Sequence, residues 1–151
     1  MNKKLYQFDL KIINLMKTYG LPILRYSLAI IFIWFGLLKP LGLSPAGKLV
    51  ANTVYWFSPE WFVPFLGWWE VVIGLCLLYK PLIRIGIGLL LLQMMGTFLP
   101  LIISPEIVYG SKPYALTLEG QYIIKNLIII GAALVIGSHL RDKTYKPQKK
   151  I

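Results

Sequence analysis

Four long apolar segments constrain the fold of this chain more than any other feature. They cover residues 21–38, 60–79, 82–103 and 118–138, and short connections separate them. A helix needs roughly 20 apolar residues to cross about 30 Å of hydrocarbon, and each segment comes close to that length. With 57% hydrophobic residues, the 151-residue chain is too apolar for an ordinary soluble domain. The sequence therefore predicts an all-α fold, an integral membrane four-helix bundle over residues 21–138.

The two ends of the chain are basic. Residues 1–20 place apolar side chains at helical spacing with lysines between them, which predicts an amphipathic helix lying on anionic headgroups. A basic tail with only partial order is the alternative for this segment. Residues 139–151 are expected to form a basic cytoplasmic tail that contacts phospholipid.

The distribution of charge predicts the orientation. Most of the sixteen Lys and Arg residues lie at the chain ends and in short loops, which does not fit a nucleic-acid groove. Both tails and the turn at 80–84 are basic, whereas the other two loops carry few positive charges. By the positive-inside rule, we expect a multi-pass protein of the cell (inner) membrane with both termini cytoplasmic.

The sequence lacks the motifs of several kinds of chemical site. Cys76 is the single cysteine and lies in an apolar run, so we expect it to pack rather than react. His139 is the single histidine, which argues against a multi-histidine metal site or a bis-histidine haem. There is no nucleophile–base pair and no phosphate loop, so we expect no catalytic residues and no autonomous enzyme.

The last apolar segment begins with a polar stretch, residues 118–126. At about 100° per residue, five polar side chains fall on one helix face: Glu119, Gln121, Tyr122, Lys125 and Asn126. The other face carries Gly120, Ile123, Ile124, Leu127, Ile128 and Gly131. We expect the polar face to turn into the bundle and the other face to meet lipid.

Counting residues from the predicted segment ends places several polar groups at one depth. Glu70 and Gln93 both come out at about 13 Å below the outer surface, and Lys125 at about 10 Å, with Asn126 beside it. An isolated charge at mid-membrane costs at least about 2.5 kcal/mol, so these groups must face each other or a wet cavity. We expect a Glu70–Lys125 ion pair, supported by the amides and lining a small pocket open toward the outer leaflet.

Lys39 and Glu119 form a second predicted pair nearer the outer water. With Glu70, Gln93, Lys125 and Asn126 they are the candidate binding residues. A purely structural role stays open, because polar pairs can hold a four-helix bundle together without chemistry. The tryptophans are expected to anchor the bundle at the interfaces, with a quinone cage as the alternative.

Five stretches resemble a known family. They are WFGLLK at 34–39, GWWEVVIGL at 67–75, PLIR at 81–84, SPE at 104–106 and GQYIIKN at 120–126. As an ordered set, spread over residues 24–137, they resemble the DoxX-like superfamily of small four-span membrane proteins. The most similar branch includes a bacterial reactive-chlorine resistance membrane protein.

The resemblance implies a four-helix bundle and, as in some members, association with redox enzymes, including a thiosulfate to quinone oxidoreductase. Another branch is similar to eukaryotic assembly chaperones of membrane receptors. Lys39, Glu70 and the polar residues of the last segment are similar to recurrent polar positions of the family. The loop between the first two segments is shorter than in the chlorine-resistance relative, so a function housed there is not expected.

Three functions follow as hypotheses. The first is a non-autonomous accessory of redox or oxidative-stress metabolism that contacts quinone at the level of Glu70, with no other cofactor evident. The second is a non-catalytic assembly protein with a stable membrane or redox protein partner. The third is a carrier or channel for a small solute, which would need a homo-oligomer because four short spans leave little room for alternating access.

Overall fold

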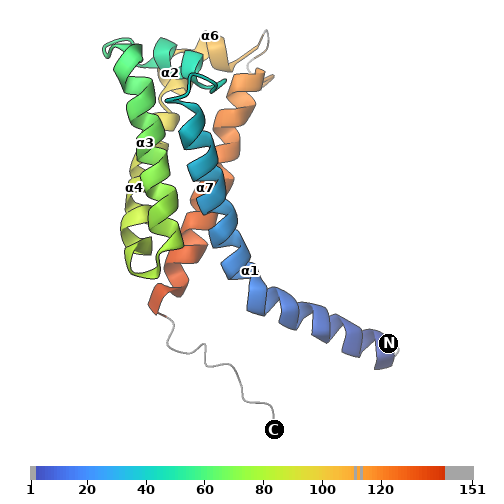
Figure 1. Cartoon of the computed structure of the whole chain (residues 1–151). Helices are drawn as coiled ribbons and strands as arrows, with labels where there is room; N and C mark the ends of the chain where they lie inside the picture. The colour runs from blue at the N-terminus through green and yellow to red at the C-terminus, as the bar shows by residue number, and fades with distance from the viewer. Residues whose placement is uncertain (1–2, 111, 113, 142–151) are drawn as a thin grey trace.

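The structure, a computed structural model, describes residues 3–110, 112 and 114–141 (Figure 1). Its elements are α1 (Lys3–Leu38), α2 (Gly47–Thr53), α3 (Pro59–Leu78), the 3₁₀ turn η1 (Lys80–Leu82), α4 (Ile83–Thr97), α5 (Pro100–Ile103), α6 (Pro105–Val108), α7 (Leu118–Ser138) and the 3₁₀ turn η2 (His139–Arg141). The described residues contain no strand, only an isolated bridge between Tyr109 and Leu116. Of the predicted basic tail, residues 142–151 lie outside the described residues.

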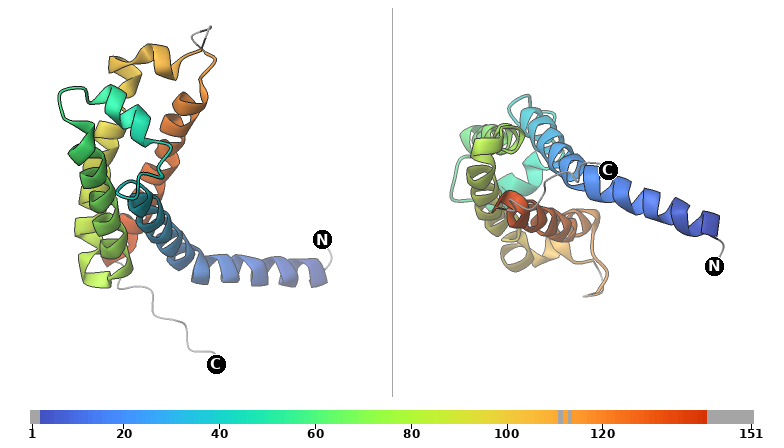
Figure 2. Two further views of the ribbon diagram at one scale, coloured as in Figure 1. Left: turned by 45° about the horizontal axis from the view of Figure 1, so that its top comes forward. Right: turned by 90° about the horizontal axis from the view of Figure 1, so that it is seen from below.

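Four helices form the bundle, and each contacts its neighbours in the ring α1, α3, α4, α7. Figure 2 shows this ring from below, and Figure 1 shows the short helices α2 and α6 over its upper end. Four helical stretches are long and apolar enough to cross a membrane: Lys3–Leu38, Pro59–Leu78, Lys80–Ile103 and Leu118–Arg141. The prediction of an all-helical chain with four such helices is confirmed.

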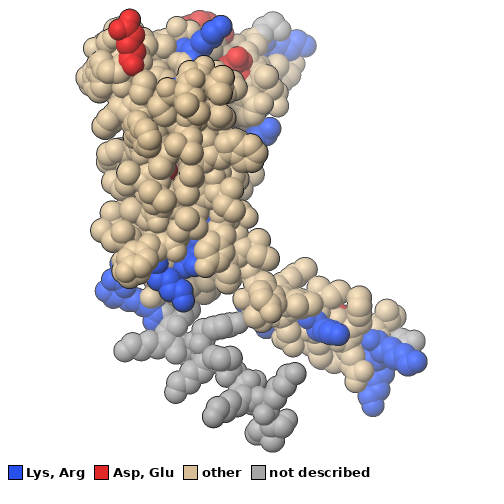
Figure 3. All heavy atoms as spheres, viewed as in Figure 1, with Lys and Arg blue, Asp and Glu red and all other residues tan. Residues whose placement is uncertain are grey.

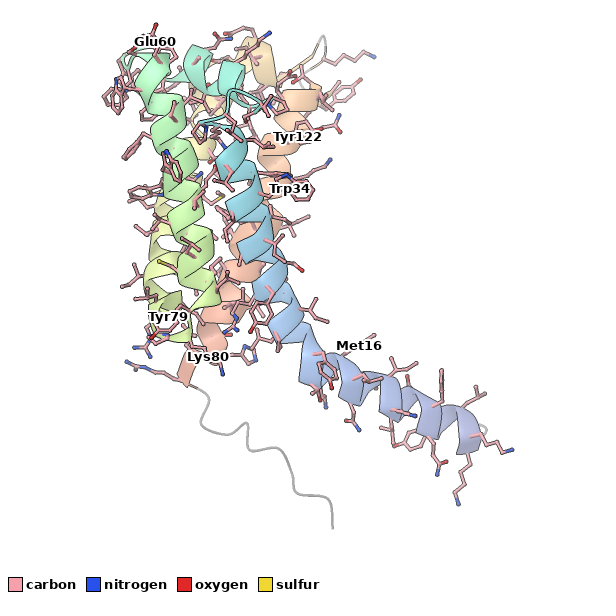
Figure 4. All side chains as sticks on the ribbon, in the orientation of Figure 1. Met16, Trp34, Glu60, Tyr79, Lys80 and Tyr122 are labelled. Atoms are coloured by element: carbon pink, nitrogen blue, oxygen red, sulfur yellow. The ribbon has the colours of Figure 1, made fainter. Side chains whose placement is uncertain are left out.

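The first helix differs from the prediction because it is continuous. The sequence suggested an amphipathic helix over residues 1–20 and a separate span over 21–38, but α1 covers Lys3–Leu38 with Pro22 inside it. Figures 1 and 2 show α1 bending away from the bundle in its N-terminal part, near the Met16 that Figure 4 labels. A proline cannot donate a backbone hydrogen bond and clashes with the preceding turn, which bends a helix without ending it.

The third predicted span is interrupted near its upper end. Residues 82–103 were expected to form one helix with a kink at Pro100, whereas α4 ends at Thr97 and α5 starts at Pro100. The Leu99 amide turns back to the Gly96 carbonyl, so the chain is already in a tight turn when it reaches the proline.

Large apolar side chains cover the outside of the bundle on all four long helices, among them Ile30, Leu75, Met95 and Ile128, all exposed. The core is small by comparison. It comprises Leu28, Ala29 and Phe32 of α1, Ile73 and Leu77 of α3, Ile83, Leu90 and Met94 of α4, and Ala132, Ala133 and Ile136 of α7. An apolar exterior of this extent is typical of a surface that lipid covers.

Candidate functional site

Helices α1 and α3 approach each other closely where two glycines meet. A Cβ atom on Gly36 would lie 2.7 Å from the Gly67 carbonyl oxygen, and a Cβ on Gly67 would lie 2.6 Å from the Gly36 carbonyl oxygen. Each glycine also makes room for a charged residue of the other helix. The Cβ of Glu70 faces Gly36, and the Cβ of Lys39 faces Gly67. Two Gly-x-x-charged segments on antiparallel helices therefore bring Lys39 against Glu70.

Lys39, Glu70 and Gln93 form a hydrogen-bonded cluster that joins three helices. Lys39 Nζ lies 2.5 Å from Glu70 Oε2, and Gln93 Nε2 of α4 donates to Glu70 Oε1 at 2.6 Å. The lysine is 8% exposed and the glutamate 13%. We call these residues the Lys39–Glu70–Gln93 cluster.

The ion pair in this cluster makes each charge depend on the other. Transfer of a single charge into a low-dielectric interior costs several kcal/mol, and a well-formed pair with additional hydrogen bonds roughly offsets that cost. Both carboxylate oxygens of Glu70 are engaged, one by the ammonium and one by the amide. The cluster therefore fixes the position of α1 along the bundle axis relative to α3 and α4.

One atom of the cluster has no partner. Gln93 Oε1 is buried and accepts no hydrogen bond from the described residues. The amide orientation is set by Glu70, because a carboxylate accepts hydrogen bonds only from the –NH₂ side of an amide. A buried unsatisfied acceptor costs about 1–3 kcal/mol, so a water or a ligand hydroxyl that donates to this oxygen would be stabilised there.

Two predicted ion pairs are wrong. Glu70 is paired with Lys39 rather than with Lys125, which is exposed with its Nζ 5.3 Å from the centre of the Tyr122 ring. Glu119 is exposed in the first turn of α7 and makes no ion pair with Lys39. Of the six candidate binding residues, the structure brings three together: Lys39, Glu70 and Gln93.

The predicted orientation of the upper half of α7 is also wrong. Glu119, Gln121, Tyr122 and Lys125 are exposed, whereas Gly120 and Ile123 of the opposite face are buried. Gly120 packs so closely on the Val108 carbonyl of α6 that no side chain would fit between them. Contact with α6 at this glycine thus turns the polar residues outward.

Asn126 lies at the inner edge of the polar stretch. It is half-buried, three residues after the buried Ile123, and so continues the inward stripe of α7. It makes no hydrogen bond with the described residues of the cluster.

The depths estimated from the sequence did not predict the Lys39–Glu70 pair. They were counted from the predicted segment ends, on the assumption that all spans end at one level. Glu70 lies eleven residues after the start of α3 at Pro59, whereas Lys39 directly follows the end of α1. Since the two side chains are in contact, α1 ends about 16 Å below the start of α3. The signal that could have found the pair is the matching Gly-x-x-Lys and Gly-x-x-Glu spacing at 36–39 and 67–70.

Aromatic rings line α3 on the upper side of the cluster. Successive centroid distances are 5.4 Å from Phe57 to Trp61, 6.1 Å from Trp61 to Phe65 and 6.1 Å from Phe65 to Trp69. Trp69 is half-buried and precedes Glu70, while Trp61 and Phe65 are exposed. The interfacial-anchor role of the tryptophans stays a prediction, and Trp69 packs against the core.

The described residues contain no group of three His, Cys, Asp or Glu side chains that could hold a metal ion. Cys76 is a free thiol, buried on the face of α3 that meets Gly86. The arrangement of Lys39, Glu70 and Gln93 can hold a proton-donating group by hydrogen bonds, and Glu70 is its one carboxylate.

Comparison of the chain with protein-family models, with curated protein sequences and with solved structures finds no match.

Proposed function

We propose that this chain is a non-autonomous membrane accessory of redox or oxidative-stress metabolism that binds a lipid-soluble quinol at the Lys39–Glu70–Gln93 cluster. The observation that carries the proposal is the buried, unpartnered Gln93 Oε1 next to a buried ion pair. A quinol hydroxyl donates a hydrogen bond to such an oxygen, whereas the carbonyl of the oxidised quinone only accepts. The resemblance to DoxX-like proteins supports the same class of ligand.

The surroundings of the cluster support an aromatic ligand. The rings of Trp61, Phe65 and Trp69 follow one side of α3 from its upper end toward Glu70. Ring pairs in offset or edge-to-face geometry contribute about 0.5–1.5 kcal/mol beyond burial alone. A quinol ring that entered from the upper end would meet these side chains before its hydroxyl reached Gln93.

For its location, we propose the cell (inner) membrane with both termini in the cytoplasm. Figure 3 shows Lys and Arg without acidic side chains at the lower end of the bundle, whereas at the upper end Lys or Arg side chains are mixed with acidic ones. Lys80 and Tyr79, labelled in Figure 4, mark the lower end and Glu60 the upper end. The positive-inside rule then assigns the lower end to the cytoplasm.

A titration with a short-chain quinol tests the proposed ligand. The protein in mild detergent is titrated with decylubiquinol and, separately, with decylubiquinone, and the fluorescence of the tryptophans is followed. We expect the quinol to bind more tightly, because only the reduced form can donate to Gln93 Oε1. Gln93→Leu should weaken quinol binding about tenfold, the effect of a charge-assisted or buried hydrogen bond near 1.4 kcal/mol. Gln121→Leu, which removes an exposed amide from α7, is the matched control.

Equal binding of both redox forms, or an unchanged quinol affinity in Gln93→Leu, would contradict this proposal. A cellular assay provides a second readout. A deletion strain should be more sensitive to hypochlorite, and wild-type protein should restore resistance while Gln93→Leu should not.

The outward polar face of α7 favours a second candidate, a membrane assembly protein. Lys125 lies about 10 Å from the start of α7 and is exposed beside Tyr122 on the outside of the bundle. A lysine at that depth must extend to the headgroups or meet a polar group on another protein. Residues Glu119, Gln121 and Tyr122 of the same face would extend such an interface.

Two variants separate the candidates. Lys125→Met should reduce co-purification of a membrane partner and leave quinol affinity unchanged if the assembly function holds. Gln93→Leu should do the reverse if the quinol accessory function holds. Lys112→Met, an exposed lysine in the loop before α7, controls for a general effect of lost positive charge.

A further inference from the structure

An open pocket of about 370 Å³ lies at the lower end of the bundle, between the start of α4 and the end of α7. Its lining residues are Arg84 and Ile87 from α4, Gly137 from α7, and Leu140 and Arg141 from η2. We call it the lower pocket. It is separate from the Lys39–Glu70–Gln93 cluster and has no part in the proposed function.

The lower pocket is strongly positive. Arg84 and Arg141 are both exposed, and neither makes an ion pair or a hydrogen bond with the rest of the described chain. No carboxylate of the described residues lines the pocket. Asp142 follows Arg141 in the sequence and lies outside the described residues. Two guanidinium groups with no acidic neighbour among the described residues favour an anion, and their planar donors match the oxygens of a phosphate.

The other half of the lower pocket is apolar. Ile87 lies one helical turn into α4 from Arg84, and Leu140 precedes Arg141. Gly137 contributes no side chain, and a Cβ atom there would lie 3.4 Å from Cδ1 of Ile87. The pocket thus combines a cationic end with an apolar wall, which suits an amphipathic anion better than inorganic phosphate.

We infer that the lower pocket binds an acidic phospholipid, with the phosphate held by Arg84 and Arg141 and the first part of an acyl chain against Ile87 and Leu140. Its position supports this ligand, because the pocket lies where two candidate membrane spans end and headgroups begin. Basic residues near a membrane surface each contribute about 1 kcal/mol to the attraction for acidic lipids.

Native mass spectrometry of the full-length protein tests this inference. The protein is released from detergent containing equal amounts of phosphatidylglycerol and phosphatidylcholine, and retained lipids are counted. We expect one phosphatidylglycerol molecule to be retained in preference to phosphatidylcholine. Arg84→Gln and Arg141→Gln should each weaken that retention about fivefold.

Two matched variants separate a built site from general attraction. Lys80→Gln removes a positive charge at the same end but outside the pocket, and we expect less than a twofold effect. Gly137→Leu keeps every charge and fills the apolar part of the pocket, so it should abolish preferential retention. A melting temperature close to that of the wild type shows that each variant is folded.

Three results would overturn the inference. The first is an equal loss in Lys80→Gln and Arg84→Gln, which would indicate diffuse charge. The second is full retention in Gly137→Leu. The third is displacement of the lipid by glycerol phosphate at equal concentration, which would identify a site for a soluble phosphate rather than for a lipid.

Discussion

At the scale of single residues, the chemistry of this chain centres on Glu70. Its two carboxylate oxygens accept hydrogen bonds, one from the ammonium of Lys39 at the end of α1 and one from the side-chain amide of Gln93 in α4. Glu119, which has the same side chain, is exposed on α7 and makes no ion pair in the described part of the chain. The two glutamates therefore allow burial and pairing to be compared for one chemical group.

We expect Glu70→Gln to destabilise the protein by about 3 kcal/mol, because it leaves the Lys39 charge buried without a counter-charge. Lys39→Met combined with Glu70→Gln should cost less than the sum of the two single changes, because no isolated charge then remains. The measurement is the free energy of unfolding in mixed detergent micelles. Glu119→Gln should change it by less than about 0.5 kcal/mol. Additive losses in the double variant would show that the ion pair contributes no coupling.

At the scale of elements, the contact between α1 and α3 depends on the missing side chains of Gly36 and Gly67. The atoms opposed to a new Cβ at either position are backbone carbonyl oxygens of the facing helix, which cannot rotate away as a side chain can. A methyl group would therefore push the two helices apart. Such a shift would also separate Lys39 from Glu70, since each lies against the glycine of the other helix.

Gly67→Ala should lower the free energy of unfolding by about 1–3 kcal/mol, the usual effect of overpacking. Gly88→Ala in α4 is the control. A Cβ on Gly88 would have no atom within 4 Å, so this change should stabilise the protein by up to about 1 kcal/mol through helix propensity. Chemical denaturation of both variants in the same micelles measures the difference. If Gly67→Ala were as stable as the wild type, the close crossing of α1 and α3 would be refuted.

The helix starts provide a second test at this scale. Thr117 is the N-cap of α7: its Oγ1 accepts a hydrogen bond from the Gly120 amide at 3.1 Å and donates to the Ile107 carbonyl of α6 at 2.6 Å. Ser58 occupies the N-cap position of α3, but its side chain makes no capping hydrogen bond.

Thr117→Val should therefore destabilise the protein by about 1 kcal/mol or more, and Ser58→Ala by much less. Thermal melts followed by circular dichroism would rank the two variants. Hydrogen exchange should also speed up at the first amides of α7 in Thr117→Val. Equal effects of the two changes would mean that the hydroxyl of Thr117 is not a specific cap.

The helices themselves could be predicted from the sequence because each is a long apolar stretch of about the length that a membrane span requires. Their relative heights could not, since the loop at residues 39–46 and the helix α2 let α1 end far below the start of α3. The rotation of α7 about its own axis could not be predicted from the sequence either. It is set by the contact between Gly120 and Val108, which are twelve residues apart and joined through a turn. A prediction from polarity alone therefore chose the wrong face of α7 as the one turned into the bundle, because polar side chains near the end of a span can extend outward to water.

At the scale of the whole molecule, charge is distributed unevenly between the two ends of the bundle. The lower end carries Lys80, Arg84 and Arg141 and no acidic residue in the described part of the chain, whereas the upper end mixes Lys48 and Lys112 with Glu60, Glu106 and Glu119. Positively charged loops are retained in the cytoplasm during insertion, so the lower end and both termini should be cytoplasmic.

Accessibility of two engineered cysteines tests this orientation in a Cys76→Ala background. Cys76 is the single native thiol and is buried, so alanine removes it at little structural cost. Lys48→Cys on α2 and Lys80→Cys at η1 replace two exposed lysines at opposite ends of the bundle. A membrane-impermeant maleimide added to intact cells should label Lys48→Cys, and should label Lys80→Cys only after the membrane is permeabilised. Labelling of Lys80→Cys in intact cells would reverse the orientation, and it would place the lower pocket in the outer leaflet, where the same arginines would then face a different set of lipids.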